Sequence, residues 1–326
     1  EPYYHRCMLV TDDKHPGDLL RLGHIDYIIR RAISLGADPV HAVIMGSYNA
    51  AQYFGLKDRG AVAPGYKANL IVVSDLENFR VEQVYKNGKL VAENGSMKEG
   101  ILAAEIKHID TPVRVGDSFH LKEIVPEQRH IEKKSDQVRV FCLTPGELTT
   151  TERLVSWTEK EGYAPGVDVD QDIVKMAVFE RHHDTGHIGL GFLGGYGLKN
   201  GAVATSIAHD SHNLIIAGTN DADMVLAGNT VRKNRGGLAV VVDGKVLGEL
   251  ALPIAGLMSE EAAEVVDEKL EKLKEEAGKL GISNSIDPFM TLAFASLPVI
   301  PKLRLNTYGL IDAEKQEIVD VMVKCM

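Results

Sequence analysis

The sequence predicts a mixed α/β protein with more than one globular unit, and three observations lead to this prediction. Within residues 1–55, a short apolar run is followed by two segments with helical periodicity. Short alternating strands joined by an Asn-Gly turn come next, before a longer region with several apolar strands and one long amphipathic helix. The length of 326 residues also suits about two domains of roughly 150 residues each.

The first segment has the pattern of one βα unit of a parallel α/β fold. Met8–Val10 is predicted to be a short buried strand. Asp18 can cap a helix that ends at Gly36, and Asp38 with Pro39 opens a second helix. Polar residues then lie just past the carboxyl end of the strand, as they do in parallel α/β folds.

The region 60–125 is predicted to be a small antiparallel β unit. Asn87-Gly88 is a strong signal for a two-residue hairpin. The strands expected around this turn are 69–73, 80–86 and 89–92. The polar and charged segment 126–137 is predicted to be a linker.

The remaining region is predicted to be a second globular unit. Its expected strands are 138–143, 173–179, 214–217 and 238–242. Asp243-Gly244 predicts a hairpin turn, and Ser259 can cap a helix that runs to Leu280. The apolar stripe of this helix is Val266, Leu270, Leu273, Ala277 and Leu280. Its other face is expected to be solvated, with the ion pairs Glu268–Lys272 and Glu275–Lys279.

Composition excludes several classes of protein. Thirty-six Lys and Arg against 46 Asp and Glu give a charge of −10, which argues against nucleic acid as a partner. No apolar stretch reaches the ~20 residues of a membrane span, and no signal-like start is present. Three distant cysteines do not suggest a disulfide framework. A cytoplasmic protein is expected, and the apolar run close after Glu1 suggests that the sequence begins inside a larger protein.

Asp12 is the first candidate for chemistry. It follows the predicted strand, at the face where parallel barrels carry their catalytic groups. A carboxylate there can ligate a metal ion and accept a proton from water. Asp12 and Asp13 are equally suited to capping the loop and the next helix, and Asp13 is the more structural of the two.

A histidine cluster is the second candidate. Five of the 12 histidines lie between residues 182 and 212. They are His182, His183, His187, His209 and His212, with Asp210 and Asn213 beside them. These residues follow or precede predicted strands, so they can converge on a ligand, and His with Asp also suits metal ligation or a proton relay. No Cys-x-x-Cys or His-Glu-x-x-His spacing supports a dedicated zinc site.

Two further patterns limit the possible chemistry. Residues 189–194 fit G-x-G-x-x-G, but no clean helix follows, so these glycines are expected to allow tight turns and close backbone approach. No two histidines stand two residues apart, so a His-x-His metal pair is missing. If Asp12 ligates a metal ion, its main partners are not in this sequence.

Several segments resemble the adenine deaminase family of the amidohydrolase superfamily. Residues 9–16 (LVTDDKHP) with 23–26 (GHID) resemble its last barrel strand and helix. Residues 59–72 (RGAVAPGYKANLIV) are similar to the return of the chain into the small β-sandwich, with Asn69 where the superfamily usually has Asp. Residues 181–219 and 236–246 are similar to the C-terminal domain that is peculiar to adenine deaminases.

The resemblance implies a fold, a reaction and a set of site residues. It implies the end of a TIM barrel over residues 1–58, a β-sandwich segment over 59–130 and an α+β C-terminal domain over 131–326. It further implies a cytoplasmic, homo-oligomeric enzyme of purine salvage with a binuclear Mn²⁺ or Fe²⁺ centre, which hydrolyses adenine to hypoxanthine and ammonia. Asp12 matches the aspartate of the last barrel strand, as metal ligand and general base.

The roles of the second cluster are less closely defined by the resemblance. His182, His209, Asp210, His212 and Asn213 match family positions and are expected to help bind the purine, from the same or a neighbouring subunit. The remaining metal ligands would lie upstream, so this portion alone is expected to be inactive. Two alternatives stay open: another cyclic amidohydrolase, and a non-catalytic oligomerisation fragment.

Overall fold

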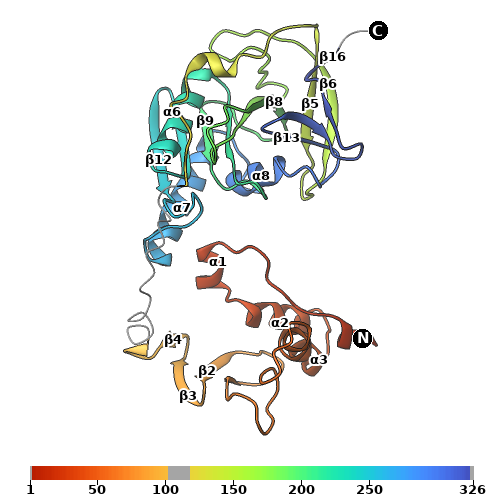
Figure 1. Ribbon diagram of the computed structural model, residues 1–326, viewed down its shortest axis with the longest axis vertical. Helices are drawn as coiled ribbons and strands as arrows, with labels where there is room; N and C mark the ends of the chain where they lie inside the picture. Colours follow the sequence, from red (N-terminus) through yellow and green to blue (C-terminus); the bar gives the residue numbers. More distant parts are fainter. Residues whose placement is uncertain (1, 102–117, 324–326) are drawn as a thin grey trace. The chain divides into compact units, whose positions relative to one another are not determined.

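The structure, a computed structural model, describes residues 2–101 and 118–323 and divides into two compact units (Figure 1). The first unit comprises residues 1–113 and the second residues 114–326. Both units contain helices and strands, so the prediction of a mixed α/β protein is confirmed. In the described part of the chain, no helix has the length and apolar character needed to cross a membrane.

The first unit begins with a group of short helices. They are η1 (Tyr4–Arg6), α1 (Pro16–Arg21), α2 (Ile25–Ser34), α3 (Pro39–Gly46) and α4 (Tyr48–Tyr53). The predicted start at Asp38-Pro39 is confirmed, because the Asp38 carboxylate accepts a hydrogen bond from the His41 amide at 2.9 Å. The single helix predicted from Asp18 is instead two helices. Gly23 separates them at a φ of 98°, a conformation that favours glycine.

The predicted strand at Met8–Val10 is wrong. A β-strand requires a hydrogen-bonded neighbouring strand, and none of the described strands pairs with this segment. The Leu9 amide donates to the carbonyl oxygen of Met45 at 3.1 Å, and the Val10 side chain is 67% exposed rather than buried. An apolar run therefore identified an extended segment but not its pairing.

A four-stranded antiparallel sheet completes the first unit. Its strands are β1 (Leu70–Val73), β2 (Val81–Lys86), β3 (Lys89–Glu93) and β4 (Ser96–Met97), in that order. Asn87 and Gly88 have φ of 51° and 76°, which confirms the predicted hairpin turn. Helices and sheet share a small core in which Ile29, Ala42 and Phe79 are buried.

The second unit is built on a nine-stranded sheet. Eight strands follow the order β12-β11-β9-β10-β7-β8-β5-β16, and β6 pairs with β5. Their bounds are β5 Gln137–Leu143, β6 Thr150–Ser156, β7 Ile173–Phe179, β8 Ile188–Gly194, β9 Ala202–Thr205, β10 Leu214–Gly218, β11 Gly237–Val242, β12 Lys245–Ala251 and β16 Met322–Val323. The four strands predicted in this region are confirmed, as is the turn at Asp243-Gly244.

Helices cover both faces of this sheet (Figure 1). Side chains alternate along a strand, so Ile215 and Ile216 point to opposite cores. Helix α6 (Asp221–Lys233) packs on one face, and α7 (Ala263–Lys279) with α8 (Pro288–Ala295) packs on the other. The second unit therefore has three layers.

Helix α7 largely follows its sequence pattern, with two corrections. The four stripe residues within the helix are buried, and Glu268 pairs with Lys272 at 2.6 Å as predicted. The helix starts at Ala263, because the Ser259 hydroxyl accepts the Glu261 amide in a preceding turn and does not cap it. Lys279 pairs with Glu276 instead of Glu275.

A second, three-stranded sheet crosses β8 where the glycines lie. It contains β13 (Leu303–Asn306), β14 (Gly309–Asp312) and β15 (Glu317–Val319). A Cβ atom on Gly189 would lie 1.7 Å from the Asn306 carbonyl oxygen. The G-x-G-x-x-G segment is thus a strand and not a nucleotide-binding loop, and its glycines do allow close backbone approach, as expected.

Residues 118–129 belong to the second unit and pack on its helix α6. Ile124 is buried, and its amide and carbonyl form hydrogen bonds of 3.0 and 2.9 Å with the Asn229 side chain on α6. The helix η2 (Pro126–Arg129) follows. The three predicted domain ranges stay a prediction.

We expect Gly189→Ala to lower the free energy of unfolding of the second unit by about 2 kcal/mol, because the backbone of Asn306 has to move. Gly191→Ala is the control, since its Cβ would meet only the end of the Leu305 side chain, at 3.2 Å. Urea unfolding followed by Trp157 fluorescence measures both variants, because Trp157 is the single tryptophan and packs on Phe192 of β8. Equal stability of the two variants would contradict the close approach.

Candidate functional site

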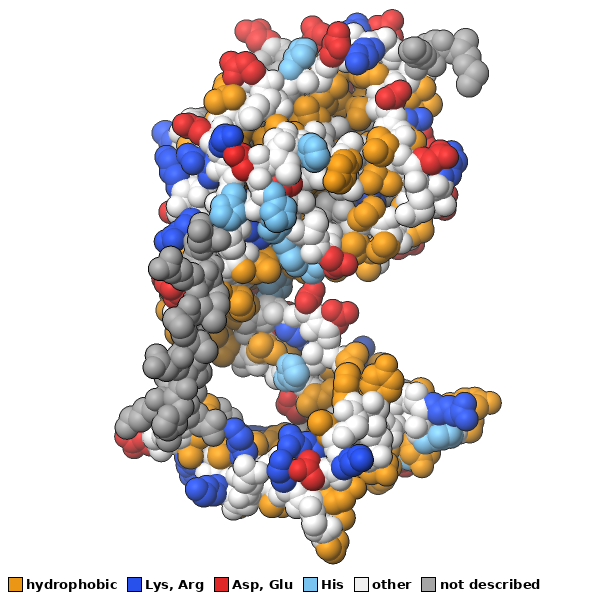
Figure 2. Space-filling model, viewed as in Figure 1, with side chains coloured by type: hydrophobic (Ala, Val, Ile, Leu, Met, Phe, Trp, Pro, Cys, Tyr) orange, Lys and Arg blue, Asp and Glu red, His pale blue; other side chains and the backbone are white. Residues whose placement is uncertain are grey.

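Two polar loops converge at one end of the nine-stranded sheet. Residues 180–187 connect β7 to β8, and residues 206–213 connect β9 to β10. Strands β7 and β10 are antiparallel neighbours, with Phe179 opposite Leu214. The end of β7 therefore lies beside the beginning of β10, and the two histidine-containing loops meet there. Figure 2 shows histidine side chains grouped on one part of the surface of the second unit.

The buried guanidinium of Arg181 connects the segments around these loops. Its side chain is 1% exposed, and each of its three nitrogens donates to a backbone carbonyl. The acceptors are the carbonyls of His212 at 2.5 Å, Ser118 at 3.1 Å and Ala255 at 2.9 Å. Burial lowers the pKa of Arg181 to about 10, so the group is still a cation at neutral pH.

The Glu180 carboxylate accepts hydrogen bonds from the first loop, residues 180–187. Burial alone would raise the pKa of its carboxyl group, but hydrogen bonds to the carboxylate outweigh burial and lower the pKa to about 2. The donors are the amides of Thr185, His182 and His183 and the hydroxyl of Thr185. The loop backbone thus folds around one ionised carboxylate.

Two of the predicted binding residues hold the loops together. The His182 ring nitrogen Nε2 lies 2.7 Å from the Ser211 carbonyl oxygen, across the two loops. Asn213 accepts the Arg181 amide at 3.3 Å through Oδ1 and donates to the Ser211 hydroxyl at 3.2 Å. Both side chains therefore have structural partners within the site.

The other three predicted residues lie in the second loop. The ring centroids of His209 and His212 are 5.6 Å apart, and His209 lies 4.8 Å from the ring of Phe294 on α8. His212 Nδ1 accepts the Ala208 amide at 3.2 Å, and Asp210 projects outward with its side chain 88% exposed. Burial, and then the charges of His209 and Arg181, lower the pKa of His212, which favours a neutral imidazole at pH 7.

Histidines 183 and 187 lie at the edge of this cluster. The His183 ring is 6.3 Å from that of His182, and the His187 ring is 5.2 Å from that of Tyr308 in the turn between β13 and β14. Across residues 2–101 and 118–323, no three His, Cys, Asp or Glu side chains are grouped so that they could hold a metal ion. As it stands, the cluster can hydrogen-bond a polar ligand.

Asp12 lies in the first unit, in the turn after the extended segment. Its side chain is exposed, its φ is 56°, and Oδ1 accepts the Asp13 amide at 2.8 Å. Nearby, the Thr11 hydroxyl and His24 Nε2 are 3.2 Å apart. The carboxylate is thus accessible at the place where the sequence puts the carboxyl end of the strand.

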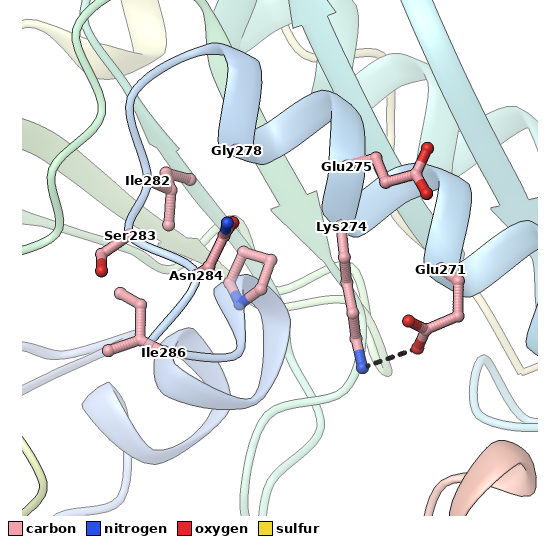
Figure 3. Close-up of a pocket in the computed structure, with 9 residues that line it drawn as sticks. Glu271, Lys274, Glu275, Gly278, Ile282, Ser283, Asn284 and Ile286 are labelled. Carbon is pink, nitrogen blue, oxygen red and sulfur yellow. Dashed lines mark hydrogen bonds and ion pairs between the residues drawn. The ribbon is translucent and has the colours of Figure 1, made fainter.

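A pocket of about 310 Å³ lies between α7 and the turn that leads into α8 (Figure 3). Lys274 projects beside it, and its ammonium group pairs with Glu271 at 3.3 Å and Asp287 at 3.0 Å. The lining includes none of the site residues that were predicted from the sequence. Two carboxylates already pair with the ammonium group of Lys274, so we assign no function to this pocket.

Glu180 and Arg181 were missed as site residues in the sequence. The available signal was a pair of opposite charges directly after seven consecutive β-strand residues, 173–179, all of which are buried. Charged residues directly after a fully buried strand need hydrogen-bond or charge partners, because burying an unpaired charge has a high free-energy cost. The structure supplies the partners of Arg181 from three distant segments, and the partners of Glu180 from its own loop.

Known proteins resemble this chain over nearly its whole length. Residues 147–317, more than half of the chain, match the family described as "Adenine deaminase C-terminal domain". Residues 5–91 match the family described as "Amidohydrolase family".

Similar proteins carry names that agree with these matches. "Adenine deaminase 2" of Carboxydothermus hydrogenoformans is 47% identical over 316 residues, which cover 97% of this chain and 54% of that protein. "Adenine deaminase" of Kosmotoga olearia is 42% identical over 99% of this chain and 55% of that protein. The chain spans about half the length of the curated relatives it matches.

We expect Glu180→Gln to lower the free energy of unfolding by about 3 kcal/mol at pH 7, because the folded loop binds the carboxylate and not the neutral acid. A folded pKa of about 2, below the ordinary 4.5, stabilises the fold above pH 4.5. That contribution is lost as the pH falls towards 2, so the difference between wild type and variant should shrink over this range. Urea unfolding followed by Trp157 fluorescence at several pH values measures it.

Glu161→Gln is the matched control, because Glu161 is exposed on a turn of the same unit. It should change the free energy of unfolding by less than about 0.5 kcal/mol. A constant difference between wild type and Glu180→Gln from pH 7 to pH 2 would contradict this role of the Glu180 carboxylate.

Proposed function

This chain belongs to the adenine deaminase family, and we propose that it is part of an enzyme that hydrolyses adenine to hypoxanthine and ammonia, in purine salvage. The match of residues 147–317 to the adenine deaminase C-terminal domain carries the proposal. The amidohydrolase match over residues 5–91 supports a hydrolytic reaction. Another cyclic amidohydrolase would not account for the C-terminal match.

Residues 1–58 would form the last strand and helices of a TIM barrel in the complete enzyme. The segment around Leu9 is not a strand among the described residues, and we propose that it pairs with barrel strands supplied by the rest of the enzyme. Residues 59–130, with the sheet β1–β4, would contribute to a β-sandwich, and residues 131–326 would form the C-terminal domain.

Asp12 would be a metal ligand and the general base. Its exposed carboxylate fits a ligand role, since Oδ1 accepts only a local amide and no described residue donates to Oδ2. The described residues contain no complete metal site, and the chain spans about half the length of its relatives, so we propose that the rest of the enzyme supplies the other ligands. We therefore expect the chain alone to be inactive.

The chemistry of the step follows from the reaction. Asp12, with ligands from the rest of the enzyme, would hold a divalent metal pair, Mn²⁺ or Fe²⁺, which would supply Lewis acidity that lowers the pKa of water towards neutrality. Asp12 accepts the proton of the attacking water and passes it to the exocyclic amine. The water oxygen forms a bond to C6 of the purine, the bond from C6 to the amine nitrogen breaks, and ammonia leaves.

The histidine loops would contact the purine. His209, Asp210 and His212 would present hydrogen-bonding groups, while His182 and Asn213 would also hold the loops in place. The lowered pKa of His212 supports this role, because a neutral imidazole can hydrogen-bond a neutral base without introducing a charge.

The setting of the enzyme is also a proposal. We expect a cytoplasmic homo-oligomer that contacts neither nucleic acid nor membrane. The net charge of −10 supports the first of these exclusions, because phosphate backbones repel an acidic surface.

In the complete enzyme loaded with Mn²⁺, Asp12→Asn should lower kcat/KM for adenine by at least about 10²-fold, because the amide cannot accept the proton. Asp13→Asn is the control and should retain most of the activity, since Asp13 is an adjacent exposed carboxylate. Ammonia release measures both. Full turnover by Asp12→Asn would overturn the assignment.

Replacing both His209 and His212 by Ala should raise KM for adenine at least about tenfold, the effect of losing roughly 1.4 kcal/mol of hydrogen bonding. His187→Ala is the comparison, because His187 lies at the edge of the cluster beside Tyr308. Unchanged KM and kcat in a folded double variant would leave these histidines with a packing role.

A further inference from the structure

Arg304 is a buried cation without a counter-charge. It lies on β13, its side chain is 1% exposed, and no carboxylate of the described residues lies within 4 Å of its guanidinium. By contrast, the buried Lys175 pairs with Asp221 at 3.0 Å. A buried charge is normally paired, because transferring an ion out of water is costly.

Carbonyl oxygens satisfy only part of the Arg304 guanidinium. Nε donates to Ile300 at 3.0 Å, and Nη2 donates to Pro301 at 3.0 Å and also to Leu148. Nη1 has no acceptor among the described residues. Arg181 shows what a purely structural arginine of this unit looks like, since all three of its nitrogens donate to carbonyls.

A small pocket lies beside Arg304. Its volume is about 210 Å³, and Arg304 is part of its wall. The apolar lining consists of Leu143, Leu148, Met290, Phe294 and Ala295. Thr291 adds a hydroxyl, and Glu147 is the only other charged residue of the wall. The pocket thus combines one incompletely satisfied cation with mainly apolar walls.

We propose that this pocket binds a small organic anion in which one carboxylate is attached to an apolar body about the size of a single aromatic ring. The carboxylate accepts a hydrogen bond from Arg304 Nη1, and the apolar body packs on Phe294 and its neighbours. The inference is independent of adenine deamination.

The surroundings favour this class of ligand over others. Inorganic phosphate needs more donors than one guanidinium nitrogen and one hydroxyl, and the apolar walls would strip its remaining water. A neutral ligand would leave the charge of Arg304 unmatched. The pocket is smaller than the 300–1,000 Å³ typical of drug-sized ligands, which limits the ligand to a small one.

Glu147 allows a test that leaves Arg304 in place. It is exposed, and its carboxylate accepts the Thr149 hydroxyl at 2.5 Å. Its negative charge at the pocket wall opposes binding of an anion. Glu147→Gln should therefore strengthen binding of a carboxylate about two- to fivefold at low ionic strength, and would weaken binding of a cation.

Isothermal titration calorimetry of the full chain with benzoate tests the proposal. We expect saturable binding with a dissociation constant on the order of 1 mM, as is usual for a ligand of this size. Benzamide, which has the same shape without the charge, should bind at least about tenfold more weakly. Arg304→Gln should abolish benzoate binding, and Trp157 fluorescence reports whether that variant is folded.

Three results would overturn the proposal. The first is that no benzoate binds at a concentration about ten times the expected dissociation constant. The second is that benzamide or inorganic phosphate binds with the same affinity as benzoate. The third is that Glu147→Gln binds benzoate more weakly than the wild type does. The last variant keeps the proposal falsifiable even if Arg304→Gln does not fold.

Discussion

The second unit depends on one buried cation, the guanidinium of Arg181. Its three nitrogens donate to carbonyls of Ser118, His212 and Ala255, which come from segments far apart in the sequence. Each of these carbonyls would otherwise need another donor, because buried backbone polar groups are rarely left unpaired. The position of the second histidine loop therefore depends on a side chain of the first loop.

Glu180, directly before Arg181 in the chain, has the opposite charge and the opposite kind of partners. Arg181 donates hydrogen bonds to backbone carbonyls, and Glu180 accepts hydrogen bonds from backbone amides. The two adjacent charges thus bind acceptors and donors respectively. The cation in turn contributes to keeping His212 neutral, since burial lowers the pKa of that imidazole and the charges of His209 and Arg181 lower it further. The protonation state of one candidate binding residue thus depends in part on a guanidinium that is itself buried.

Close packing at β8 positions another part of the second unit, the strand β13. The absence of side chains at Gly189 and Gly191 lets β13 and its neighbours cross the sheet at short range. Arg304 lies on the same strand, β13, and forms part of the wall of a pocket that α8 and the loop after β5 also line. The glycines that resembled a nucleotide-binding loop thus serve the packing of β13 on β8.

The sequence by itself determined the local structure of this protein and its family. Four of the nine strands of the large sheet, the turns at Asn87-Gly88 and Asp243-Gly244 and the apolar stripe of α7 depend on short-range sequence patterns. Only the tertiary structure decided the rest. Only neighbours distant in the chain decide the lack of a paired strand at Met8–Val10 among the described residues, the convergence of the two loops and the partners of Arg181 and Arg304. Burial and hydrogen bonding between such neighbours are properties of the folded chain, and residue spacing does not encode them.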